Sequence, residues 1–99
     1  MEEHIERGGL FDPATFWHEA WPLVEIRVSE ESVRVFGLTR RWRWEYRDVH
    51  LARRRYLLLP CVEIRNRRDG SETGVWFVPV SYAKLVQAFG RYGYDISTI

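Results

Sequence analysis

Arginine is the residue type whose number and spacing in this sequence point to a chemistry. Fourteen of the fifteen basic residues are arginine, and eleven of them fall within residues 32–68, where three acids lie. Guanidinium groups bind carboxylates and phosphates through paired hydrogen bonds. Residues 1–31 have the opposite balance, with eight acids against two bases. The net charge of +1 therefore conceals a basic middle block.

Three arginine clusters make up this block, around residues 40–43, 53–55 and 65–68. If the strands that carry them are neighbours, alternate members share a face and their positive potentials add. Such a face would attract the phosphate of a lipid headgroup or a nucleic acid. The candidate ligand-binding residues are Arg41, Arg43, Arg53, Arg54, Arg55, Arg65 and Arg67.

A second interpretation of the block needs no ligand. The arginine stems would cover apolar sheet surface while their charges pair with Glu25, Glu45, Glu63 and the acidic N-terminus. We favour this interpretation because the neutralising acids are present in the same chain. A GC-rich genome, which favours arginine codons, would also produce the excess without selection for binding.

Patterns for catalysis or metal binding are missing from the sequence. His18-Glu19 begins a zinc-protease motif, but Pro22 stands where its second histidine would fall. The three histidines lack ligand spacing, and there is no glycine-rich phosphate loop. We therefore expect no catalytic residue, no metal and no cofactor.

Length and composition bound the architecture. Ninety-nine residues with 45% hydrophobic side chains suit one domain with one core. Cys61 is the single cysteine, so an internal disulfide is impossible. Apolar runs are too short to span a bilayer and the first residues are acidic, unlike a signal peptide, so we expect a cytoplasmic protein.

The last regular element organises the predicted fold. Apolar side chains at helical spacing form one stripe, which consists of Tyr82, Leu85, Val86 and Phe89. Ser81 is a suitable N-cap, and Gly93 can close the C-terminus. We expect a helix from Tyr82 to about Tyr92 that docks on a preceding sheet, because so short a helix is unstable alone.

Alternation of apolar and polar residues predicts six strands before this helix. They are expected at residues 23–28, 33–36, 41–46, 49–56, 61–67 and 73–80. In the third strand the alternation turns Trp42 and Trp44 toward the core rather than outward as stacking platforms for nucleic acid. The last strand is apolar on both faces, which predicts a central position or a covering helix.

The N-terminal residues give a different signal. Charged residues and Gly8-Gly9 indicate a flexible leader over residues 1–12, so that the domain would occupy residues 13–99. Asp12-Pro13 predicts the start of a short helix over Pro13–Ala20. Phe16, Trp17 and Trp21 are expected to cover a sheet face or a second subunit.

These elements predict a mainly β fold of the α+β class. It would be an antiparallel barrel or orthogonal sandwich of six to seven strands, closed by the C-terminal amphipathic helix, with a short N-terminal helix. The element order resembles the pleckstrin-homology (PH)-like superfold, particularly its bacterial members, over residues 21–96. The matching patterns are Trp44-Glu-Tyr-Arg-Asp48-Val49, Trp76-Phe77-Val78, and Leu85-Val86 with Phe89 and Gly93. That superfold has seven strands, and the predicted N-terminal helix is additional to it.

The resemblance implies an interaction module. Phosphoinositide binding in the PH family uses basic residues of the first hairpin, where this chain offers Arg27 and Arg34 beside three acids. Other members bind peptides or proteins, often through a strand added beside the closing helix, or self-assemble. We expect a noncatalytic module that binds a protein partner or a second copy of itself. The alternative is an anionic lipid or nucleic acid on the arginine face, and a small-ligand pocket or an enzyme is least favoured.

Overall fold

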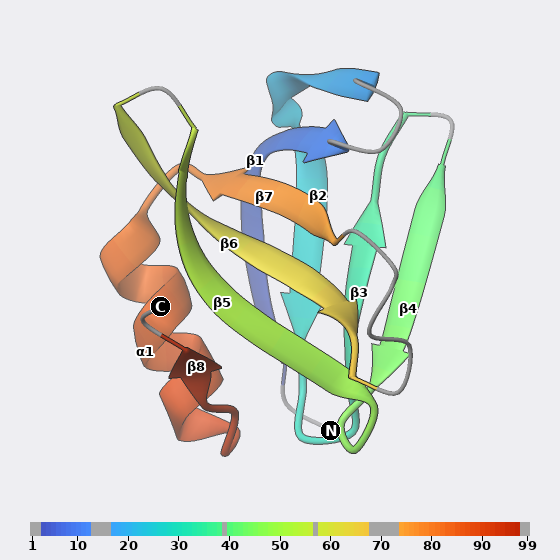
Figure 1. Ribbon diagram of the computed structural model, residues 1–99, viewed down its shortest axis with the longest axis vertical. Helices are drawn as coiled ribbons and strands as arrows, with labels where there is room; N and C mark the ends of the chain where they lie inside the picture. Colours follow the sequence, from blue (N-terminus) through green and yellow to red (C-terminus); the bar gives the residue numbers. More distant parts are fainter. Residues whose placement is uncertain (1–2, 13–16, 39, 57, 68–73, 98–99) are drawn as a thin grey trace.

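The structure, a computed structural model, describes residues 3–12, 17–38, 40–56, 58–67 and 74–97. They form a strongly curled sheet of eight strands, a half-barrel, followed by one helix (Figure 1). The strands are β1 (His4–Asp12), β2 (Trp17–Val28), β3 (Ser32–Phe36), β4 (Arg41–Glu45), β5 (Val49–Tyr56), β6 (Leu59–Asn66), β7 (Val75–Pro79) and β8 (Ile96–Ser97), and the helix is α1 (Tyr82–Arg91). No helix among the described residues is long and apolar enough to cross a membrane.

The strand order is β4-β3-β2-β1-β7-β6-β5-β8, so β1 joins two groups of strands. Neighbouring strands are antiparallel, except that β8 runs parallel to β5. In Figure 1, β5, β6 and β7 cross in front of the group that contains β2, β3 and β4, and α1 lies to one side. The two groups share one core, to which they contribute Val24, Ile26, Val33, Val35, Leu51, Val62, Ile64 and Phe77.

The curl depends on a bend in β1. The register of β1 against β2 shifts between Gly8 and Leu10, which marks a β-bulge. At this bend Gly8 and Gly9 pair with Pro79 and Val78 of β7. A Cβ atom on Gly8 would overlap the carbonyl oxygen of Val78, so glycine is needed where these two strands approach.

The start of α1 is confirmed and is tied to β1. The Ser81 hydroxyl accepts a hydrogen bond from the backbone N–H of Lys84 at 3.4 Å. The Ser81 N–H in turn donates to Glu6 Oε2 at 2.9 Å. Glu6 is a buried acid of β1, and its other oxygen lies 3.0 Å from His4 Nε2. The carboxylate therefore holds the helix start against the sheet and has its own hydrogen bonds satisfied.

The end of α1 is a Schellman motif, in which Gly93 has a φ of 85°. The Tyr94 N–H donates to Phe89 O at 2.9 Å, and the Gly93 N–H donates to Gly90 O at 3.2 Å. The rings of Tyr94 and Phe89 lie 5.8 Å apart, edge to face. The predicted closure at Gly93 is thus confirmed, and it directs Tyr94 back into the core.

The six expected strands correspond to β2 through β7. Trp42 and Trp44 pack against the core, whereas Arg41 and Arg43 between them are exposed, as the alternation predicts. β7 lies between β1 and β6, which confirms the central position that its apolar pattern indicates. The sheet has two strands more than the six read from the sequence, namely β1 and the two-residue β8.

The predicted N-terminal helix over Pro13–Ala20 is wrong. Residues 17–28 form β2, which pairs with β1, and residues 13–16, including Phe16, lie outside the described part. Asp-Pro is also a common turn signal, and here long-range strand pairing prevails over local helix capping. The segment expected as a leader contains β1, which pairs with β2 along its length and with β7 at residues 8–11. The backbone at Trp17 and Trp21 belongs to β2, and their predicted covering role stays a prediction.

We expect Gly8→Ala to destabilise the fold by about 1–3 kcal/mol or more, because the added methyl group collides with backbone atoms of β7. Gly90→Ala is the matched control. Gly90 lies in α1, and a Cβ atom there has no neighbour within 4 Å, so alanine should stabilise the protein by up to about 1 kcal/mol. Chemical denaturation measures both changes, and equal effects would contradict the close approach of β1 and β7.

Candidate functional site

The structure distributes the candidate arginines over two parts of the sheet. β4, which carries Arg41 and Arg43, is one edge of the sheet, whereas β5 and β6 pair with each other near the opposite edge. The first cluster is therefore not on a strand next to the other two. The contacts of each cluster decide which guanidinium groups are available to a ligand.

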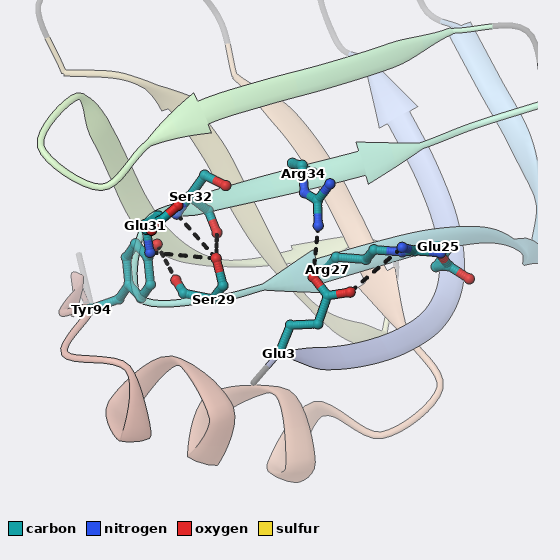
Figure 2. Close-up of polar contacts among 8 residues, drawn as sticks. All are labelled: Glu3, Glu25, Arg27, Ser29, Glu31, Ser32, Arg34 and Tyr94. Carbon is teal, nitrogen blue, oxygen red and sulfur yellow. Dashed lines mark hydrogen bonds and ion pairs between the residues drawn. The ribbon is translucent and has the colours of Figure 1, made fainter. Parts of the chain in front are cut away.

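Acids of the same chain neutralise the outer face of β2 and β3. Arg27 Nε donates to Glu25 Oε2 at 2.6 Å, which raises the pKa of the Arg27 guanidinium. Arg34 donates to Glu3 at 2.6 Å, and Glu3 also lies 3.5 Å from Arg27. Figure 2 shows Glu3 beside the two arginines. This arrangement supports the interpretation in which arginine charges serve internal pairs.

Three arginines lie around the ring of Phe36 of β3. The guanidinium carbons of Arg27, Arg34 and Arg41 lie 5.2, 5.8 and 5.7 Å from the ring centroid. These are cation–π distances, and they place arginine stems over the sheet surface. On β4, the guanidinium of Arg43 donates to Glu45 at 2.8 Å.

Alternation along β5 separates the members of the second cluster. Arg53 and Arg55 share one face, and Arg54 lies on the other. Arg54 is 3.1 Å from Glu63, a buried acid of β6 that also accepts a hydrogen bond from the Trp76 indole at 3.3 Å. Arg53 and Arg55 are exposed, and the Arg53 guanidinium lies 5.5 Å from the centre of the Tyr82 ring at the start of α1. Arg54 is thus a structural arginine, unlike its two neighbours.

The third cluster leads to a hollow at the end of α1. Arg65 is half-buried opposite His50, whereas Arg67 is exposed and lines a cavity of about 300 Å³. The hollow lies where the β4–β5 turn and the ends of β6 and α1 meet. Its lining consists of Tyr46, Arg47, Val49, Leu51, Arg67, Gly93, Tyr94 and Asp95. The sequence reasoning selected Arg67 and missed the other lining residues.

Two tyrosines hold the walls of the hollow. The Tyr94 hydroxyl donates to Ser29 O in the β2–β3 turn at 2.6 Å, as Figure 2 shows. The Tyr46 hydroxyl donates to Gly93 O at 2.8 Å, and the two rings meet edge to face at 4.9 Å. Burial, with smaller effects of Tyr46 and Glu45, raises the pKa of Tyr94 to about 12. Both hydroxyl protons are thus engaged in internal bonds.

The described residues contain no group of three or more His, Cys, Asp or Glu side chains that could hold a metal ion. His4 lies against Glu6, and His50 pairs with Arg65 in the sheet. Cys61 is buried. The hollow is one place in the described structure where charged and aromatic side chains converge on an open volume.

Comparison with known proteins found no match to a protein-family model, a curated protein sequence or a solved structure. The curled sheet with its C-terminal helix is accordingly established by the structure itself, without a family assignment.

The sequence predicts only one feature of the hollow, the end of α1 at Gly93. Gly93 marked the helix end, but the Schellman geometry that turns Tyr94 inward depends on the chain after it. The placement of Arg47 beside Arg67 depends on pairing between β5 and β6, which are joined through a distant hairpin. Local patterns carry no such long-range information.

We expect Tyr94→Phe to cost about 1–3 kcal/mol near neutral pH, because it removes a hydrogen bond to a buried carbonyl. The unfolded chain ionises Tyr94 near pH 10, whereas the folded chain retains the proton until about 12. The unfolded state then binds fewer protons, so the wild type should lose stability across this interval. Denaturation at several pH values should show the variant's deficit shrinking above pH 10.

Tyr92→Phe is the matched control for this measurement. The Tyr92 ring packs against the core, but its hydroxyl has no hydrogen bond with the described residues. A Tyr92→Phe variant that matches Tyr94→Phe in both cost and pH dependence would contradict the specific role of the bond to Ser29.

Proposed function

We propose that this chain is a noncatalytic, cytoplasmic interaction module of the bacterial PH-like type, whose main activity is protein binding, including self-association. Support for the fold type comes from the curled sheet and its closing C-terminal helix, which are the features that the resemblance implies. The eighth strand departs from the seven of that superfold. Support for the activity comes from the edge strand β4.

β4 pairs with β3 on one side, and in the described structure no strand pairs with its other side. The Gly37 N–H donates to Arg40 O, and the Tyr46 N–H donates to Glu31 O. Backbone groups of even-numbered residues thus point to β3. By alternation, those of Arg41, Arg43 and Glu45 point outward and can form bonds with another strand. The Glu45 carbonyl, which already accepts the Asp48 N–H at 2.9 Å, would accept such a bond with its second lone pair.

The charges on this edge complement each other in an antiparallel pair of two copies. A twofold axis at Arg43 places Arg41 opposite Glu45 of the second copy, and Glu45 opposite Arg41. Opposite charges across a strand pair stabilise it, and each hydrogen-bonded pair adds two backbone bonds. Arg43 would face its own copy, but Glu45 of the same chain already binds its guanidinium at 2.8 Å. This self-complementary edge is the observation that carries the proposal.

Charge exchange tests the pairing. Arg41→Glu or Glu45→Arg alone places like charges opposite each other twice in the dimer, and should weaken it by roughly 1–3 kcal/mol. The double exchange restores opposite pairs and should recover the dimer. Analytical ultracentrifugation measures the dissociation constants, with Arg55→Glu as a control outside β4. A monomeric wild type, or a double variant as weak as the single ones, would overturn the proposed interface.

The second candidate function is anion binding by the arginine face, and the β5–β6 hairpin favours it. Beside the exposed Arg53 and Arg55, Leu58 and Leu59 are 88% and 52% exposed. Basic side chains next to apolar ones suit an anionic lipid surface, which attracts the charges and accepts the leucines. The same arginines alone would serve a nucleic acid.

Reversal of two charges tests this candidate while leaving the Arg54–Glu63 pair intact. If the hairpin binds lipid, Arg53→Glu with Arg55→Glu should weaken binding to phosphatidylserine vesicles at least about tenfold. Leu58→Ser should also weaken it, whereas Arg91→Glu in α1 should change little. Co-sedimentation at about 0.15 M salt measures binding. Binding to an oligonucleotide that is insensitive to Leu58→Ser would instead assign the face to nucleic acid, and absence of both would remove this candidate.

A further inference from the structure

We propose that the hollow at the end of α1 is a binding site for a small organic anion, a carboxylate or phosphate monoester with an aromatic or apolar body. This site is distinct from the β4 edge and from the β5–β6 hairpin. It goes beyond the proposed interaction function and does not depend on it.

Backbone bonding brings two arginines to the rim of the hollow. The Arg67 N–H donates to Asp48 O at 2.6 Å, and Arg47 directly precedes Asp48 in the β4–β5 turn. The turn is closed by the bond from the Asp48 N–H to Glu45 O at 2.9 Å. Arg47 and Arg67, 20 positions apart in the chain, therefore flank one opening.

These two guanidinium groups differ from the arginines of the chain that are paired with acids. Both are exposed, and neither forms an ion pair with another described residue, whereas Arg27, Arg34, Arg43 and Arg54 each have an acid within 3.1 Å. A planar guanidinium binds carboxylate or phosphate oxygens in pairs. Two of them at one opening supply the charge and the donors for a single anionic group.

Apolar side chains form part of the lining of the hollow, and the rest of the lining is polar. Val49 and Leu51 belong to the core, with exposures of 3% and 2%, and the Tyr94 ring is similarly buried. The hydroxyls of Tyr46 and Tyr94 donate to backbone carbonyls, so they do not offer their protons to a ligand. A ligand would thus place its apolar part against the portion of the lining that Val49, Leu51 and the Tyr94 ring form. The volume of about 300 Å³ suits a small molecule.

Asp95 allows a test of whether the hollow prefers negatively charged ligands. Its carboxylate also lines the hollow, so it opposes an anion there. If the site is built for anions, Asp95→Asn should strengthen binding while removal of the arginines weakens it. A site that merely collects apolar molecules would respond to neither change.

The experiment is a titration of the folded protein with phenyl phosphate and benzoate, followed by the NMR shifts of backbone amides. We expect saturable shifts concentrated at residues 46–51, 67 and 93–95. Benzamide, a neutral analogue of benzoate, should bind at least about tenfold more weakly, as should inorganic phosphate, which lacks the apolar body. Benzoate and phenyl phosphate together distinguish a carboxylate from a phosphate site.

Variants decide whether the arginines are responsible. Arg47→Gln with Arg67→Gln should weaken binding by at least about tenfold, because the loss of even one charged hydrogen bond has that effect and the double variant removes two charged groups. Arg55→Gln, an exposed arginine of β5, should leave it unchanged, and Asp95→Asn should tighten it. These are exposed positions, so dispersed amide spectra should show that every variant folds. Equal binding of benzamide, no effect of the double variant, or no saturable shift at the hollow would each overturn the proposal.

Discussion

The structure depends on the close approach of β1 and β7 at Gly8. Because no side chain separates the two strands there, β1 can bend and pair with β2 on one side and β7 on the other. The two strand groups then face each other across one core, and α1 lies against them. β1 also fixes the helix, since Glu6 accepts the Ser81 N–H and the Val80 N–H donates to Arg7 O. A strand rich in polar residues thus sets both the curl of the sheet and the position of its helix.

The arginine excess serves different physical roles at different places. On β2 and β3, the guanidinium groups pair with nearby acids and cover the Phe36 ring. On β5, Arg54 offsets the charge of the buried Glu63. The partly exposed pairs on β2 and β3 contribute little stability, but they cancel the field that would attract phosphate. Sheet topology, rather than the number of arginines, decides which charges remain available to a ligand.

The sequence predicted those elements whose signals are local. The α1 stripe with Ser81 and Gly93, the alternation in β3 through β6 and in the second half of β2, and the apolar run of β7 predict their elements correctly, because each pattern reports one element's own exposure. β1 could not be predicted from the sequence because its inward side carries Glu6, an acid that is tolerated there only through its tertiary hydrogen bonds. Asp12-Pro13 predicts a helix start from local sequence alone, because the residue types that cap helices also occur in turns. The hollow could not be predicted for a similar reason, since Arg47 and Arg67 come together only when β5 and β6 pair.

The β4–β5 turn connects the two proposed surfaces. Glu45 ends the edge strand, and Tyr46 follows it directly as a wall of the hollow. Tyr46 is fixed at both ends, because its N–H donates to Glu31 O and its hydroxyl donates to Gly93 O. The two proposed surfaces thus share one turn that is held by hydrogen bonds on both sides. If binding at one surface changed the affinity of the other, the change would be reciprocal, because each affinity would change by the same factor.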